Sequence, residues 1–175
     1  MSLIVETGAG IPGAESYVSV AEALIYHANR VNSSWSAATT ATQEAKLREA
    51  TAYLDSTYRE RWKGWRIEQA LEWPRYEVTI SGALQRNALS GGFIGGGYLP
   101  NNQIPQRLKD ATCEAALRAL SGPLLADVDH KVLREMVSRG IETWYNDVDV
   151  ATTYPAIDGL LSGLLLPSGM GDVVR

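Results

Sequence analysis

Two stretches in the first third of the chain carry apolar residues at helical spacing. The first begins at Ser19 and Glu22, whose spacing is that of a capping box, and it predicts a helix over residues 20–31. The second predicts a helix over residues 43–60. The residues between them, 32–42, are rich in Ser, Thr and Ala, and this composition predicts a connecting segment without regular structure.

A third helix is predicted over residues 104–120, because Pro105 suits a first helical turn and Gly122 with Pro123 supplies a stop. One apolar row of this helix contains Leu108, Ala111, Ala115 and Ala119. The opposite row is also apolar, so the second half of the helix needs neighbours on every side. This opposite row is a candidate subunit interface and consists of Cys113, Ala116, Leu117 and Leu120.

Between the second and third helices the pattern is irregular. Residues 62–76 contain aromatic residues, Gly64 and Pro74, which predict an irregular segment, and residues 77–80 predict a short strand. Glycines then cluster, with five of them between residues 91 and 97, so residues of about 81–102 are expected to form a long flexible loop.

The last quarter of the chain leaves two alternatives open. Residues 132–145 fit a helix by their apolar spacing, but Gly140 and an alternating pattern around it also fit strands. A short apolar helix is predicted over residues 154–166, starting near Pro155, and the tail at about 167–175 is expected to fray. The fold class predicted from the residues is therefore mainly α.

Composition predicts a single domain over residues 1–175, since 45% of the residues are hydrophobic and 21% are charged. The net charge is −4, and it arises after residue 140, where five acids face one base; the remainder holds 15 acids and 15 bases. A neutral body does not favour nucleic-acid binding through overall charge. Cys113 is a single cysteine and cannot form an internal disulfide, and we expect folding in a cytosol, with no membrane-spanning segment.

Motifs for catalysis or cofactors are not apparent. The metal-binding residue types His27, His130 and Cys113 are far apart in the sequence. The glycine run lacks the Gly-Lys-Ser/Thr of a phosphate loop, and Cys113 lies in an apolar helix where a thiolate is unfavourable. We therefore expect no enzyme activity, no catalytic or metal site and no cofactor.

Basic and aromatic residues alternate between residues 58 and 76, a pattern typical of single-stranded nucleic-acid binding. The simpler interpretation, which the sequence favours, is a turn whose tryptophans pack on the core and whose arginines are solvated or paired with nearby glutamates. In the nucleic-acid interpretation the candidate contacts are Arg59, Arg61, Trp62, Lys63 and Trp65.

Several stretches, in order along the chain, resemble the head-tail adaptor (head-completion, neck) proteins of tailed phages and prophages. The resemblance is to the branch labelled DnaT-like single-stranded DNA-binding protein. The stretches are LIVETG at 3–8, SYVSVAEA at 16–23, AYLD at 52–55, WKG at 62–64, LEWPR at 71–75, IPQRLKDATCE at 104–114 and TTYPAID at 152–158.

This resemblance implies a bundle of about four helices with a β-hairpin at residues 132–145, between the third and C-terminal helices. It also implies a structural virion protein, a connector that assembles as a homo-oligomeric ring on the portal protein and docks neck or tail proteins. Duplex DNA would pass through without sequence-specific contact. The implied location is the virion neck, with the host cytoplasm during assembly. Single-stranded DNA binding is the alternative function.

Overall fold

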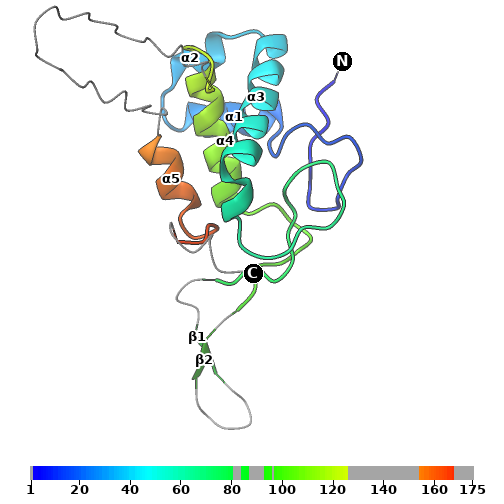
Figure 1. The fold of residues 1–175 in the computed structure, drawn as a ribbon. Coiled ribbons are helices and arrows are strands. Elements are labelled where there is room, and N and C mark those ends of the chain that lie inside the picture. Colours follow the sequence, from blue (N-terminus) through cyan, green and yellow to red (C-terminus); the bar gives the residue numbers. More distant parts are fainter. Residues whose placement is uncertain (1, 81–83, 87–92, 96, 126–153, 168–175) are drawn as a thin grey trace, which may run out of the picture.

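The structure, a computed structural model of the chain, describes residues 2–80, 84–86, 93–95, 97–125 and 154–167. These residues form a mainly helical fold, which confirms the predicted class (Figure 1). One 3₁₀ turn, η1, covers Arg59–Arg61, and two short strands, β1 and β2, cover Leu84–Arg86 and Phe93–Gly95. The α-helices are α1 Val20–Ala28, α2 Ser33–Ala37, α3 Thr40–Tyr58, α4 Gln106–Ala119 and α5 Pro155–Leu161.

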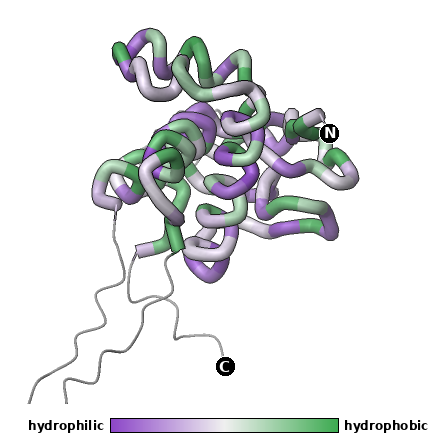
Figure 2. Tube along the Cα trace, turned by 90° about the horizontal axis from the view of Figure 1, so that it is seen from above, coloured by the Kyte–Doolittle hydropathy of each residue, from purple (hydrophilic) through white to green (hydrophobic). Residues whose placement is uncertain are grey.

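The centre of the fold is the packing of α3 against α4, with α1 and α5 on either side of α4 (Figure 1). Leu47 and Leu54 of α3 and Leu108 of α4 are completely buried. Alanines supply much of the rest of the α4 contact surface, and small side chains let neighbouring helices approach closely. Hydrophobic and hydrophilic stretches alternate along the helices, as amphipathic packing requires (Figure 2).

Helix α1 begins as predicted, with the amide of Glu22 donating to Ser19 Oγ and the amide of Ser19 donating to the Glu22 carboxylate. It ends at Ala28 rather than at residue 31, since the chain turns there and Val31 adopts a φ of +57°. The next residues form the short helix α2, where an irregular segment was predicted. The fully buried Trp35 anchors α2 on the core.

The other helices differ from their predicted bounds mainly at the ends. Helix α3 begins at Thr40, earlier than predicted, because Thr39 Oγ1 accepts from the amide of Thr42. Helix α4 lies within its predicted range. Helix α5 stops at Leu161 and a turn follows at residues 162–164, where the Leu164 carbonyl accepts from the amide of Lys63; Leu165 then pairs with Trp62.

The glycine-rich stretch contains a short strand pairing, whereas most of the C-terminal part lies outside the described residues. Within the predicted flexible loop, β1 and β2 pair in antiparallel fashion, so part of that stretch is regular and projects from the helices (Figure 1). The hairpin predicted at residues 132–145 and the tail beyond residue 167 lie outside the described residues, and the hairpin gains no support. Within the described ranges, no helix is long and apolar enough to cross a membrane.

The N-terminal segment is fixed to the fold by a buried acid. The Glu6 carboxylate accepts hydrogen bonds from the amides of Gly8, Gly10 and Ile11 at 2.7–3.0 Å. Gly8 lies against the backbone at residues 102–103, where a Cβ would overlap main-chain atoms. This contact holds the N-terminal loop against the segment that leads into α4.

Candidate nucleic-acid interface

The segment that follows η1 folds back on itself through two short antiparallel pairings. Trp65 pairs with Tyr76, and Thr79 pairs with Tyr98. Gly64 permits the first pairing because its φ is +74° and a Cβ there would overlap the Tyr76 carbonyl oxygen. The two pairings present aromatic side chains beside the helical bundle.

Trp65 and Tyr76 form an exposed aromatic pair. Each amide donates to the other residue's carbonyl, at 2.8 and 2.9 Å, so the two residues are direct cross-strand partners. Side chains of such partners leave the backbone on the same face. The Trp65 side chain is 71% exposed and that of Tyr76 is 38% exposed. A large aromatic surface therefore faces solvent and is not packed against the core.

Arg75 fixes the backbone just before Trp65. Its guanidinium donates to the carbonyl oxygens of Lys63 and Gly64, both at 2.9 Å, and to the Glu72 carboxylate at 3.0 Å. The residue is almost completely buried. Burial lowers the pKa of the Arg75 guanidinium, and the charge of Glu72 opposes that shift. These bonds fix the turn that precedes Trp65.

Glu72 is the shared anion of three arginines. Besides Arg75, the Nε of Arg59 and the Nη1 of Arg66 each lie 3.5 Å from Glu72 Oε1. Arg59 and Arg66 are much more exposed than Arg75, so their ion pairs are weak and screened by solvent. Both guanidinium groups can exchange the carboxylate for another anion at the surface.

A second buried acid docks this segment on the helices. Asp55 of α3 accepts from the hydroxyl of Tyr17 at 2.6 Å and from the amide of Glu72 at 3.1 Å. The amide of Trp73 in turn donates to the Tyr17 hydroxyl at 3.2 Å. Burial raises the pKa of Asp55 to about 6, although both hydrogen bonds act to lower it. The loop is thus held by polar bonds from two elements.

The predicted contact residues differ in burial: some are packed in the core and others are exposed. Trp62 is only 3% exposed and packs edge-on against Trp73, so it belongs to the core and cannot stack on a base. Lys63 donates its ammonium to the Gly163 carbonyl at 2.9 Å, and Arg61 is half-buried beside Tyr58. Arg59 and Trp65 are exposed. The turn interpretation therefore describes Trp62 and Trp73 correctly, but it is wrong for Trp65.

Two aromatic residues of this surface were not among the predicted contacts. Tyr76 lies 11 positions after Trp65 in the sequence, and no local pattern pairs the two. Tyr98 follows the glycine run and was assigned to a flexible loop, yet it is 60% exposed on the pairing with Thr79. Both become visible only when the backbone pairings are known.

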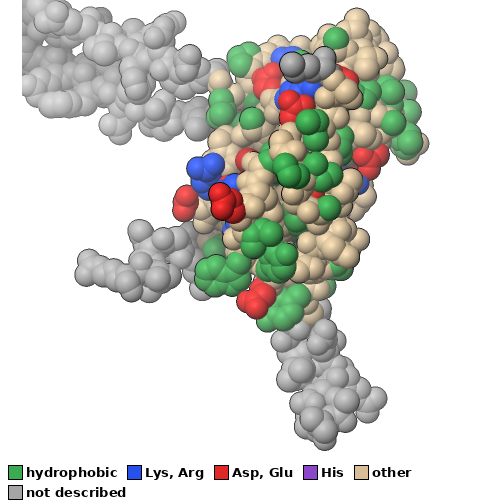
Figure 3. Space-filling view, turned by 90° about the vertical axis from the view of Figure 1, so that its right-hand side faces the viewer, with side chains coloured by type: hydrophobic (Ala, Val, Ile, Leu, Met, Phe, Trp, Pro, Cys, Tyr) green, Lys and Arg blue, Asp and Glu red, His purple; other side chains and the backbone are tan. Residues whose placement is uncertain are grey.

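The charge of this face is mixed. Between residues 59 and 76 there are five basic and three acidic residues, a local charge of +2 in a chain whose net charge is −4. On the side of the molecule that carries the N-terminal segment and the chain after α3, hydrophobic side chains are spread over the face, with one group at its lower end (Figure 3). Basic and acidic side chains lie next to one another beside them. Aromatic contact, more than charge, is what this surface offers.

The predicted subunit interface on α4 is partly covered within the chain. Cys113 and Ala116 are buried, whereas Leu117 and Leu120 are half-buried at the edge of the core. Burial, with smaller contributions from nearby acids, raises the pKa of the Cys113 thiol to about 12, so it is a packing residue. No cluster of three or more potential metal ligands occurs among the described residues. Self-association through Leu117 and Leu120 stays a prediction.

A family described as "Putative DnaT-like ssDNA binding protein" matches residues 1–175. The chain belongs to this DnaT-like family. The match covers the Trp65 surface, the helical core and the C-terminal part alike. No curated protein and no solved structure matches the chain.

The DnaT-like assignment corrects the main functional prediction. The sequence stretches led us to expect a structural connector of the virion neck, with single-stranded DNA binding as the alternative. The family description agrees with the alternative, so the connector prediction is wrong, and the head-tail adaptor part of the resemblance is not confirmed. The portal and neck partners and the location that accompanied it are untested.

Proposed function

We propose that this DnaT-like protein binds single-stranded DNA without catalysis, using the exposed Trp65–Tyr76 pair as a stacking surface. The observation that carries the proposal is the exposure of Trp65. A folded domain usually covers much of an indole, but here the two backbone hydrogen bonds with Tyr76 hold Trp65 where its side chain is exposed. Bases of a single strand have free faces, and aromatic side chains are the usual platforms for them.

Arg59 and Arg66 are the cations that we assign to the strand's phosphates. They lie near Trp65 in the chain, and each makes a weak ion pair with Glu72, while Arg66 also donates to the Gln69 carbonyl at 2.7 Å. A phosphate group can take the place of that carboxylate as their partner. Two or three such contacts predict a salt dependence with a slope of roughly −1.5 to −2, since each phosphate contributes about −0.7 for single strands.

The test is fluorescence anisotropy with a labelled oligothymidine at low salt. Trp65→Ala should weaken binding roughly 5- to 150-fold, the effect of one base stacked on an aromatic residue. Trp65→Phe should retain part of the affinity, because a smaller ring still stacks. Trp62→Ala is not diagnostic, since its buried indole supports the fold.

A matched control is Ile25→Ala, which removes a 64% exposed apolar side chain from α1. It should leave the affinity unchanged, which excludes general stickiness of exposed apolar groups. Absence of binding at low salt, or equal binding by the Trp65→Ala protein, would overturn the proposal.

A further inference from the structure

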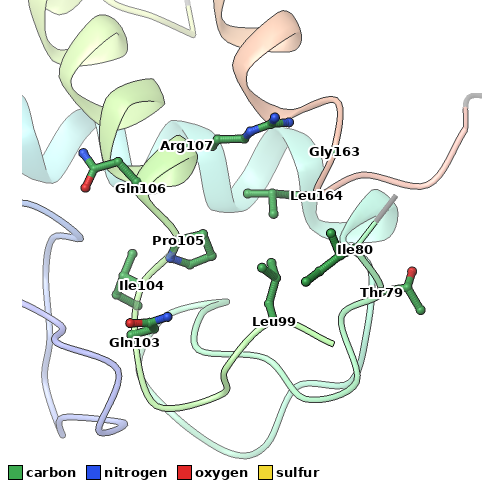
Figure 4. A pocket seen from close by; sticks show the side chains of 10 residues that line it. All are labelled: Thr79, Ile80, Leu99, Gln103, Ile104, Pro105, Gln106, Arg107, Gly163 and Leu164. Carbon is green, nitrogen blue, oxygen red and sulfur yellow. The ribbon is translucent and has the colours of Figure 1, made fainter. Parts of the chain in front are cut away.

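A pocket of about 430 Å³ lies where the start of α4, the Thr79–Tyr98 pairing and the chain after α5 come together (Figure 4). Its volume is in the range of pockets that hold small ligands. The apolar side chains of Ile80, Leu99 and Leu164 point toward its centre, and Pro105 closes one side (Figure 4). The pocket therefore offers an apolar interior wide enough for a flat ring.

The pocket has a cationic edge. The Arg107 side chain extends from the first turn of α4 toward Gly163, and its Nη1 occupies the space that a Cβ of residue 163 would fill (Figure 4). Arg107 is exposed and makes no hydrogen bond or ion pair with the other residues that the structure describes. Such a guanidinium is available to an anion, and its geometry favours two oxygens of a phosphate.

Gln103 adds an amide to the rim of the same pocket. A side-chain amide has both a donor and an acceptor, so it can bond to the polar edge of any base without strong selection among them. An apolar slot, one amide and one cation together match a nucleotide, which has a flat ring, a polar ring edge and a phosphate.

The pocket and the Trp65–Tyr76 pair are built on one backbone run. Ile80 donates to the Gly97 carbonyl and Leu99 donates to the Val78 carbonyl, at 2.8 and 2.9 Å, so this pairing forms the pocket wall and also carries Tyr98. From residue 76 to residue 80 an extended chain spans at most roughly 13 Å. A strand of about four stacked nucleotides at 3.4 Å each is therefore long enough to reach from the pair to the pocket.

We infer that this pocket receives one nucleotide of the bound single strand, with its base against Ile80, Leu99 and Leu164 and its phosphate at Arg107. The inference rests on the proposed function and adds a second site to it. Stacking on Trp65 gives contact with any base face, while the pocket fixes where the strand lies on the protein.

The test follows the methyl resonances of Ile80, Leu99 and Leu164 during titration with thymidine 5′-monophosphate, thymidine, inorganic phosphate and an oligothymidine. The monophosphate should shift these methyls with a dissociation constant on the order of 1 mM. Thymidine or phosphate alone should bind roughly tenfold more weakly, because each lacks half of the contacts. The oligothymidine should shift the same methyls.

Two variants and one control separate binding from folding. Arg107→Ala should weaken the monophosphate roughly tenfold. Gly163→Ala should also weaken it, because the added methyl displaces the end of the Arg107 side chain and the backbone there has no positive φ. Arg30→Ala removes the same charge from the end of α1, where Arg30 lies over the Tyr26 ring, and should leave the titration unchanged.

Three results would overturn the inference. The first is no methyl shift with the monophosphate, and the second is equal affinity for thymidine and its monophosphate. The third is an oligothymidine that binds at Trp65 without shifting the methyl resonances of the pocket. In the last case the proposed function survives and the pocket inference fails alone. If the oligothymidine does not bind at all, the proposed function fails, and the pocket has no strand to hold.

Discussion

Replacing Glu72 by Gln tests whether one buried carboxylate holds the Trp65 segment together. The substitution keeps the shape of the side chain but removes the charge that faces Arg75 at 3.0 Å. The side chains of Glu72 and Arg75 are 5% and 9% exposed, so water cannot replace the lost anion. The variant thus leaves a buried guanidinium without its counter-charge.

The expected loss of stability follows from that burial. Removing one partner of a buried ion pair costs about 3–5 kcal/mol. Arg75 keeps its hydrogen bonds to the carbonyls of Lys63 and Gly64, which place partial negative charge beside it. We therefore expect the lower end, about 3 kcal/mol. With an m-value of about 2–3 kcal/mol/M, the urea midpoint should fall by about 1 M.

Urea unfolding followed by tryptophan fluorescence measures this loss. The control is Glu44→Gln, which breaks a helical pair with Arg48 that has a 3.8 Å separation and greater exposure, and it should cost about 0.5 kcal/mol or less. Combining Glu72→Gln with Arg75→Met should cost less than the two single substitutions added together, because no buried charge is then unpaired. A loss for Glu72→Gln no larger than that for Glu44→Gln would refute the reasoning.

Three further predictions concern buried acids and a strained turn. Since burial raises the pKa of Asp55 to about 6, the folded protein binds this proton more tightly than the unfolded chain, and the contribution of Asp55 to stability should fall by about 2 kcal/mol as pH rises from about 4 to about 6. Urea unfolding of wild type and Asp55→Asn across this range should show this fall in the difference between the two proteins, because the other acids contribute equally to both. Gly64→Ala forces a Cβ against the Tyr76 carbonyl and should cost more than about 2 kcal/mol and abolish oligothymidine binding, whereas Gly122→Ala, in open space, should change stability by less than about 1 kcal/mol. Glu6→Gln turns one acceptor of the N-terminal loop into a donor facing a backbone amide and should cost about 2 kcal/mol in thermal or urea unfolding.

The long helices could be predicted from the sequence because their signals are local. The capping box at Ser19 and Glu22 and the apolar spacing in α3 and α4 involve residues within a few positions of each other. The ends were less predictable, since tertiary contacts decide them. Helix α2 has no periodic pattern of its own, and it exists because Trp35 fills the core and the side-chain amide of Gln43 donates to the Trp35 carbonyl.

The candidate site depends on contacts that a linear pattern does not contain. The run of basic and aromatic residues pointed to the correct segment, but Trp62 and Trp65 look equivalent in the sequence. Their roles separate because Trp62 pairs with Leu165, a residue more than one hundred positions away, whereas Trp65 pairs with Tyr76 on the outer edge. Which tryptophan is buried is therefore a result of long-range folding.

The near-neutral charge of most of the chain does not favour nucleic-acid binding, but it does not exclude binding at one face. Net charge sums over the whole surface, whereas a short strand contacts one small face. On that face the contact that we propose is the exposed aromatic surface of Trp65, and stacking on an aromatic ring does not require a basic protein. A site of this kind should bind with moderate affinity and lose roughly 8- to 16-fold of it between 50 and 200 mM salt, far less than proteins that hold nucleic acid through many phosphates. A shallow salt dependence combined with a large effect of Trp65→Ala is therefore the specific signature that separates this surface from a charge-driven one.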